Sequence, residues 1–184
     1  VHVFWDRSVS RLDDDLAAER ALLGDWLRAK GAQKVSVTLF DSTAPETHAD
    51  LTPQAALSLI ASQRYRGGTS FAGLAEVKVA PGTPCLLFSD GRPTIDGQGQ
   101  GLPCAARAVT SGPEADRALL SELTGNTPVE LDPKNHAAAL SRLRGPGSPV
   151  ARLTDEAGRA VAGMDREIQA AMRAMPDVGV ALTV

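Results

Sequence analysis

The sequence predicts a doubly wound α/β fold, in which a mostly parallel central sheet is flanked by helices on both faces. Short apolar runs alternate with helical stretches along residues 1–143, and this alternation is typical of a parallel sheet covered on both sides. The apolar runs are nearly continuous, as in strands buried on both faces. Polar residues follow several of these runs directly, at the strand ends where open parallel sheets bind ligands.

The first strand and the first helix follow from an apolar run and from a helical spacing of leucines. Residues 1–5 (Val-His-Val-Phe-Trp) form the predicted strand,. A helix is predicted over 12–30, and Gly31 ends it,. Three aspartates at 13–15 fall in its first turn, where the helix dipole favours negative charge,. A metal cluster is the alternative interpretation of this triplet.

The next elements have clear boundary residues. The run 35–40 is a second strand, and a proline-containing turn at 44–46 reverses the chain into an edge strand at 47–51,. Thr52 is placed to cap a helix over 53–64, with proline at its first position,. The remaining expected elements are a short helix at 70–74, strands at 84–89 and 105–110, a helix at 113–124 with Pro113 in its first turn, a strand at 129–131 and a helix at 133–142.

The chain is expected to contain one domain and a C-terminal appendage. The domain covers residues 1–143, and a Gly- and Pro-rich linker follows at 144–149,. Residues 150–184 are an extension that we interpret as the start of a following domain. Because the first residue already lies in a predicted strand, we expect a piece of a larger parent protein. An Ala-, Arg- and Gly-rich composition with few lysines suits a bacterial parent, at the cell surface or membrane rather than in the cytoplasm.

The composition excludes several classes of function. A formal net charge of −3 argues against a nucleic-acid surface, which needs a concentrated basic face,. No stretch approaches the roughly 18 apolar residues of a membrane span. Two cysteines, Cys85 and Cys104, are expected as buried thiols, because geometry between parallel strands seldom suits a disulfide,; a disulfide is the alternative.

Five oxygen-bearing residues follow predicted strands or lie in a glycine-rich turn. Asp6, Ser8 and Ser10 follow the first strand at alternate positions, Thr69 follows Gly67-Gly68, and Asp90 follows the strand at 84–89. The carboxyl ends of neighbouring parallel strands meet at one edge of a sheet, so we expect these residues to converge. One carboxylate, two serine hydroxyls, a threonine and a second carboxylate suit an octahedral Mg²⁺ that keeps some of its waters.

The order Asp-x-Ser-x-Ser, then Thr, then Asp resembles the metal-ion-dependent adhesion site (MIDAS) of von Willebrand factor type A (vWA) domains. The matching residues are Asp6, Ser8, Ser10, Thr69 and Asp90. The contexts Gly-Gly-Thr-Ser-Phe and Phe-Ser-Asp-Gly are also similar to those of the family, and the resemblance covers residues 1–143. Many members have Gly and Met where this chain has Val9 and Arg11.

The resemblance implies a protein-binding function. It implies that Ser8, Ser10 and Thr69 coordinate the ion directly, and that the two aspartates act largely through waters. Neutral hydroxyls leave the ion's charge poorly neutralised, so an Asp or Glu of a protein partner takes the open position. We therefore expect a cation-dependent adhesion or assembly module and not an enzyme, with Mg²⁺ as the ion and Mn²⁺ or Ca²⁺ as substitutes.

Alternatives remain open from the residues alone. Each of the five residues also has a purely structural interpretation as a helix cap or a turn residue, so a structural module without metal-dependent binding is one alternative. A metal-dependent hydrolase is another, although Ser8 stands where aspartyl-phosphate phosphatases need a second carboxylate. A nucleotide site at the glycine-rich run 97–101 lacks the adjoining strand and helix that a dinucleotide fingerprint requires,.

Overall fold

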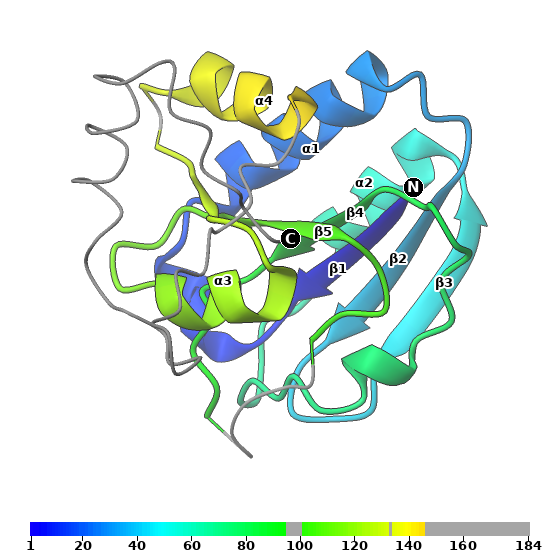
Figure 1. Ribbon diagram of the computed structural model, residues 1–184. Coiled ribbons are helices and arrows are strands. Elements are labelled where there is room, and N and C mark those ends of the chain that lie inside the picture. The colour runs from blue at the N-terminus through cyan, green and yellow to red at the C-terminus, as the bar shows by residue number, and fades with distance from the viewer. Residues whose placement is uncertain (95–100, 133, 146–184) are drawn as a thin grey trace, which may run out of the picture. The chain divides into compact units, whose positions relative to one another are not determined.

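The computed structural model describes residues 1–94, 101–132 and 134–145 (Figure 1). Its centre is one six-stranded sheet with the strand order β3-β2-β1-β4-β5-β6. The strands are β1 (His2–Asp6), β2 (Val35–Phe40), β3 (Glu46–Leu51), β4 (Cys85–Phe88), β5 (Ala106–Thr110) and β6 (Val129–Glu130). The helices are α1 (Leu16–Ala29), α2 (Pro53–Ala61), α3 (Arg117–Thr124) and α4 (His136–Arg144), with 3₁₀ turns η1 (Val9–Asp13) and η2 (Leu74–Glu76).

The order of the strands reverses between β1 and β4, and this reversal places the candidate site. From β1 the chain moves outward through β2 to β3, and it then crosses back to β4 and moves outward the other way. β1 is parallel to both β2 and β4, whereas β3 is antiparallel to β2. Doubly wound sheets bind ligands beyond the carboxyl ends of the strands at such a reversal. The predicted fold class is confirmed.

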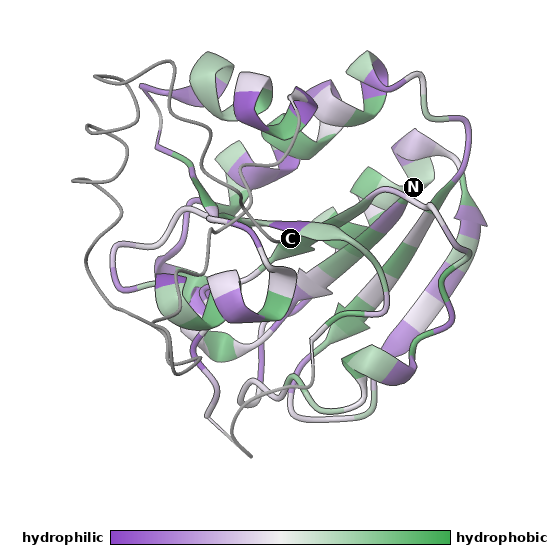
Figure 2. Ribbon diagram, in the orientation of Figure 1, coloured by the Kyte–Doolittle hydropathy of each residue, from purple (hydrophilic) through white to green (hydrophobic). Residues whose placement is uncertain are grey.

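Helices cover both faces of the sheet because successive side chains of a buried strand point in opposite directions. Val3 and Trp5 pack in one core with residues of α1, α2 and α4. Phe4 packs in a second core with residues of α3 and with Phe71. Figure 2 shows the hydrophobic residues concentrated in the central strands, whereas the edge strand β3 is largely hydrophilic.

Three predicted helix starts are wrong, those of α1, α3 and α4, and α4 begins at His136 rather than at residue 133. α1 begins at Leu16 rather than at residue 12, because the Asp15 carboxylate caps it by accepting from the Ala18 N–H at 2.9 Å. α3 begins at Arg117 rather than 113, because Asp116 caps it in the same way through the Leu119 N–H. The short helix expected at 70–74 is instead the 3₁₀ turn η2. A carboxylate that accepts from the first turn fixes where a helix begins.

The expectation of two free thiols is also wrong, because Cys85 and Cys104 form a disulfide, with their Cα atoms 6.4 Å apart. Cys85 begins β4, and its register partner on β5 is Ala106. Cys104 therefore lies in the segment before β5 and not within the strand. The geometric argument against a bridge between parallel strands does not apply to a loop residue.

The predicted extension 150–184 and most of the predicted linker 144–149 lie outside the described residues, as do residues 97–100 of the glycine-rich run. Among the described residues, no helix combines the length and the apolar character that crossing a bilayer requires.

Candidate metal centre

The site begins with Asp6, the last residue of β1. Its side chain is wholly buried, and both carboxylate oxygens accept hydrogen bonds. Oδ1 accepts from the backbone N–H of Ser8 at 2.9 Å, and Oδ2 accepts from the hydroxyl of Ser89 at 2.7 Å. Ser89 directly follows the neighbouring strand β4. Asp6 therefore joins the loops after the two central strands.

Three hydroxyls converge beside Asp6 from segments that are far apart in the sequence. The Oγ atoms of Ser8 and Ser10 lie 3.0 Å apart, and Ser10 Oγ lies 3.4 Å from Thr69 Oγ1. Ser8 and Thr69 are fully buried. The structure thus brings together Asp6, Ser8, Ser10 and Thr69, as the sequence predicted.

The backbone around Thr69 holds its hydroxyl in place. The Thr69 N–H donates to Thr94 Oγ1 at 2.7 Å, and the Thr94 N–H donates back to the Thr69 carbonyl at 3.0 Å. Gly67 has a φ of +68°, and its carbonyl accepts from the Val9 N–H at 3.0 Å. These bonds tie the glycine turn to the loop that carries both serines. Thr94 was missed from the sequence, where only its position shortly after Asp90 could have drawn attention to it.

Asp90 lies at the same edge but makes no hydrogen bond to the other four predicted residues in the described chain. Its Oδ1 accepts from the Arg92 N–H at 3.0 Å. Its Oδ2 is buried and has no hydrogen-bond partner among the described residues. A buried carboxylate oxygen without a partner is costly, and coordination of a cation through a water is one way to satisfy it.

A fully buried arginine, Arg11, adjoins the site and was missed as a site residue. Its guanidinium forms ion pairs with Asp14 and Glu19, and Nη1 donates to the Asp6 carbonyl at 3.4 Å. The guanidinium carbon also lies 5.8 Å from the centroid of the Trp5 ring. Arg11 follows the second serine at the position where many vWA domains have Met, and this departure was the only signal in the sequence.

Burial dominates the electrostatics of this cluster. It raises the pKa of Asp6, and the charge of Arg11 and the hydrogen bonds from Ser8 and Ser89 oppose that rise only in part. Burial would lower the pKa of Arg11, yet Glu19, Asp6 and Asp14 together raise it. The charged side chains buried at this edge are the five carboxylates of Asp6, Asp14, Glu19, Asp41 and Asp90 and the two guanidinium groups of Arg7 and Arg11. This excess of carboxylates suits a bound cation.

The donor set determines which ion would fit. In the described part of the chain, no three His, Cys, Asp or Glu side chains gather in a way that could hold a metal. A cation here would therefore depend on the serine and threonine hydroxyls together with the aspartates. Such hard oxygen donors suit Mg²⁺ and Mn²⁺ rather than Zn²⁺, which prefers nitrogen and sulfur ligands. The residues present fit the predicted ion.

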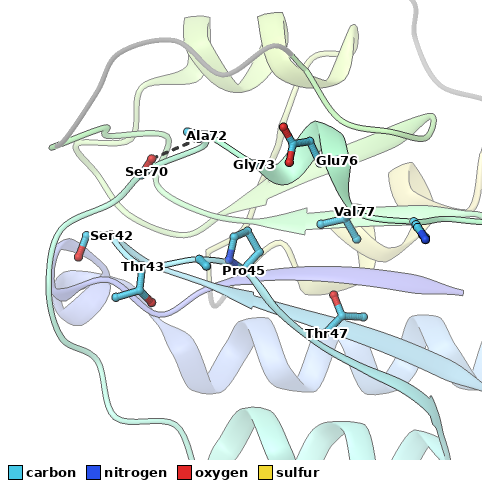
Figure 3. A pocket seen from close by; sticks show the side chains of 11 residues that line it. Ser42, Thr43, Pro45, Thr47, Ser70, Ala72, Gly73, Glu76 and Val77 are labelled. Atoms are coloured by element: carbon cyan, nitrogen blue, oxygen red, sulfur yellow. Dashed lines mark hydrogen bonds between the residues drawn. The ribbon is translucent and has the colours of Figure 1, made fainter.

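A cavity of about 610 Å³ lies beside the site but contains none of the five predicted residues. Figure 3 shows its lining: Ser42, Thr43 and Pro45 follow β2, and Ser70 follows Thr69. Glu76 is the only acidic residue among the described residues that line it. Its size does not make it the functional centre, because it lacks the convergent, buried polar groups found around Asp6.

Comparison with solved structures finds the same fold in proteins of very different sequence. An aerotolerance-related membrane protein from Bacteroides fragilis is 13% identical with a TM-score of 0.59, over 77% of this chain and 96% of that chain. The pilus adhesin SpaC from Lactobacillus rhamnosus GG is 14% identical with a TM-score of 0.53, over 78% of this chain and 29% of that chain. The VWA domain of SpRpn10 is 11% identical with a TM-score of 0.51, over 88% of this chain and 97% of that domain.

The sequence itself matches no family profile and no curated protein. At 11–14% identity, the structural likeness establishes the fold and nothing finer.

Proposed function

We propose that the domain binds a protein partner in a way that depends on Mg²⁺. The likenesses to solved structures support a von Willebrand factor type A-like fold, and the proposal starts from that fold. Ser8, Ser10 and Thr69 would hold the ion directly, and Asp6 and Asp90 would hold it largely through waters. The observation that carries the proposal is the convergence of the Ser8, Ser10 and Thr69 hydroxyls beside the buried Asp6. The unpartnered Asp90 Oδ2 supports it independently.

The arrangement of charge favours an acidic partner. The three hydroxyls are neutral, and Asp6 is already engaged by Ser8 and Ser89. When bound, the ion would supply an open coordination position with uncompensated positive charge, which attracts a carboxylate. The residues of this chain orient the donors and exclude water from one side of the site. We infer binding rather than catalysis, because within the described residues no His or Glu hydrogen-bonds to the hydroxyls as a general base would,.

Calorimetric titration with Mn²⁺, using the whole chain, tests the proposal. Thr69→Ala removes one hydroxyl, and we expect the affinity for Mn²⁺ to fall about tenfold or more, as is common when a metal site is perturbed. Ser70→Ala is the matched control: among the described residues its hydroxyl accepts only from the Ala72 N–H, at 3.2 Å, and it makes no bond to the cluster, so the affinity should stay unchanged. Far-UV circular dichroism checks that both variants fold.

Absence of Mn²⁺ binding by the wild-type chain at millimolar concentration would refute the metal site. Partner capture that persists in a chelator would favour the alternative, a structural module in which this edge of the sheet binds no ion. Hydrolysis that survives Thr69→Ala would point to chemistry at another site.

A further inference from the structure

Two large apolar side chains are exposed beside the candidate metal centre. Val9 is 50% exposed and Leu12 is 59% exposed, and within the described ranges these are the exposed large hydrophobic residues. Both belong to the 3₁₀ turn η1, which directly follows Ser8 and contains Ser10. Single exposed apolar residues are ordinary on a protein surface. A pair confined to the loop that carries two candidate ligands is a more specific arrangement.

The geometry of the turn places these two side chains on one outer face. A 3₁₀ helix has three residues per turn, so residues i and i+3 lie one above the other. Val9 and Leu12 are such a pair, and Ser8 and Arg11 form the corresponding inner pair, both fully buried. We call the outer pair the apolar rim.

The rim is held rigidly, as a preorganised contact should be. The backbone of Val9 is bound to Gly67, and the Arg11 N–H donates to the Ser8 carbonyl at 3.3 Å. Between the two rim residues, the side chain of Arg11 is fixed in the interior by Asp14 and Glu19. The rim therefore cannot turn inward without breaking buried ion pairs, and a partner would meet it already in place.

The surface next to the rim is acidic. Asp13, Asp14, Asp90 and Glu114 line a hollow of about 280 Å³, in which Arg92 pairs with Glu114 at 3.0 Å. This negative charge opposes docking of an anionic lipid surface, which brings many like charges, whereas a loop brings a single carboxylate that the ion would attract. Two side chains also make far too small a patch for a stable dimer of this chain, since such interfaces bury about 800 Å² per partner. The occupant that fits is a short exposed loop of another protein.

We propose that the apolar rim determines which partner loops bind. It favours loops in which a large apolar residue lies within two positions of the coordinating Asp or Glu. The carboxylate would reach the ion held by Ser8, Ser10 and Thr69, and the neighbouring side chain would pack on Val9 and Leu12. This inference rests on the proposed function, because the carboxylate anchors the loop. It adds a requirement that metal coordination alone does not impose.

Selection from a displayed library of random seven-residue loops tests the inference. The wild-type chain is immobilised in Mn²⁺, and bound loops are eluted with EDTA. We expect the eluted loops to contain Asp or Glu with Leu, Ile, Val or Phe within two positions. The Val9→Ser/Leu12→Ser variant should keep its Mn²⁺ affinity within twofold but bind a selected peptide at least tenfold more weakly. The conservative variant Val9→Ile/Leu12→Met should retain peptide binding.

The outcomes separate this inference from the proposed function. If the wild-type chain binds no Mn²⁺, both fail. If it binds Mn²⁺ and selects acidic loops without an apolar neighbour, only the rim is refuted. Loss of Mn²⁺ affinity in the double serine variant would also refute the rim, since the two residues would then act on the metal loop itself. Wild-type dimers that dissociate in the double serine variant, or binding to anionic vesicles, would assign the rim to another occupant and refute a partner loop.

Discussion

At the scale of single residues, Arg11 organises the interior below the candidate site. Its guanidinium is fully buried and joins η1 to α1 through Glu19. Glu19 also accepts from the Ser111 hydroxyl at 2.8 Å, which extends the network to the end of β5. Each charge in this network is tolerated in the interior only because its neighbours compensate it.

Arg11→Met should be strongly destabilising. Removing the guanidinium leaves Glu19 and Asp14 buried without their counter-ion, and breaking a buried pair in this way costs about 3–5 kcal/mol. Urea denaturation of the variant and the wild type measures the loss. Arg28→Met is the control: Arg28 pairs with Asp25, but its side chain is 79% exposed, so the change should stay below about 1 kcal/mol. Equal losses in the two variants would contradict the structural role assigned to Arg11.

His2 makes stability depend on pH in the acidic range. Burial lowers its pKa from 6.5 to about 4, and its Nε2 lies 2.8 Å from Thr38 Oγ1. Between these two pKa values the unfolded chain binds the proton and the folded chain does not. The contribution of His2 to stability is therefore complete above pH 6.5 and is lost as the pH falls towards 4, by about 2–3 kcal/mol.

The difference between the wild type and His2→Gln isolates this effect, because the other titrating groups are common to both proteins. Urea denaturation at a series of pH values should show the wild-type stability falling relative to the variant as acid is added. Two parallel profiles would mean that His2 is already protonated in the folded chain.

The candidate site residues could be predicted from the sequence where an oxygen-bearing side chain directly follows a strand or turn signal. Ser8, Ser10 and Thr69 carry hydroxyls after strand or turn signals, and the structure brings these hydroxyls together. Whether they bind a metal stays a prediction. Arg11 could not be predicted as a buried residue, because its burial depends on Asp14 and Glu19 folding over it, and this tertiary contact leaves no local pattern in the sequence.

At the scale of elements, the turn after β4 depends on Gly91, which lets the chain leave Asp90 beside α3. Its φ is +70°, and an added Cβ would lie 2.6 Å from the Asp116 carbonyl oxygen and 2.8 Å from Leu120 Cγ. Both neighbours belong to the start of α3 or to its cap. The glycine is therefore required for conformation and also for space.

Gly91→Ala should destabilise the protein by about 2–5 kcal/mol, which combines the left-handed backbone with overpacking. Gly125→Ala is a matched control, because Gly125 has a φ of +66° but nothing within 4 Å of an added Cβ. There the cost should be only the backbone term of about 1–2 kcal/mol. Thermal or urea denaturation compares the two variants, and indistinguishable stabilities would show that the contact with α3 relaxes freely.

The strands were easier to predict than the starts of the helices. β2 spans the predicted residues, β1 and β4 deviate by one residue at each end, and β5 deviates by one residue at its start, because a buried parallel strand is a continuous apolar run with polar ends,. α1 and α3 begin four residues later than predicted. Several residues before each helix could act as a cap, and the capping aspartate is decided by tertiary contacts such as the bond from the Asp15 N–H to Ser111 Oγ at 2.9 Å.

At the scale of the whole molecule, the candidate site and the disulfide lie at opposite ends of β4. Cys85 begins this strand, whereas Ser89 and Asp90 follow its last residue. The disulfide closes a loop that begins at Cys85, includes Ser89 and Asp90 after β4, and ends at Cys104 before β5. It therefore limits the freedom of the unfolded chain without touching any candidate ligand.

Removal of the bridge should lower stability and leave metal affinity unchanged. The two cysteines are 19 residues apart, and closing a loop of that length stabilises a protein by about 3 kcal/mol through the entropy of the unfolded chain. Cys85→Ser/Cys104→Ser should lose about this much free energy of unfolding in urea. Dithiothreitol should produce the same loss in the wild type and none in the variant. Mn²⁺ titration should give the same affinity for both proteins, because β1 and the turn at Thr69 hold the hydroxyls without help from the bridge. A weaker affinity in the reduced protein would instead mean that the loop containing Asp90 needs the bridge at the far end of β4 to stay in position.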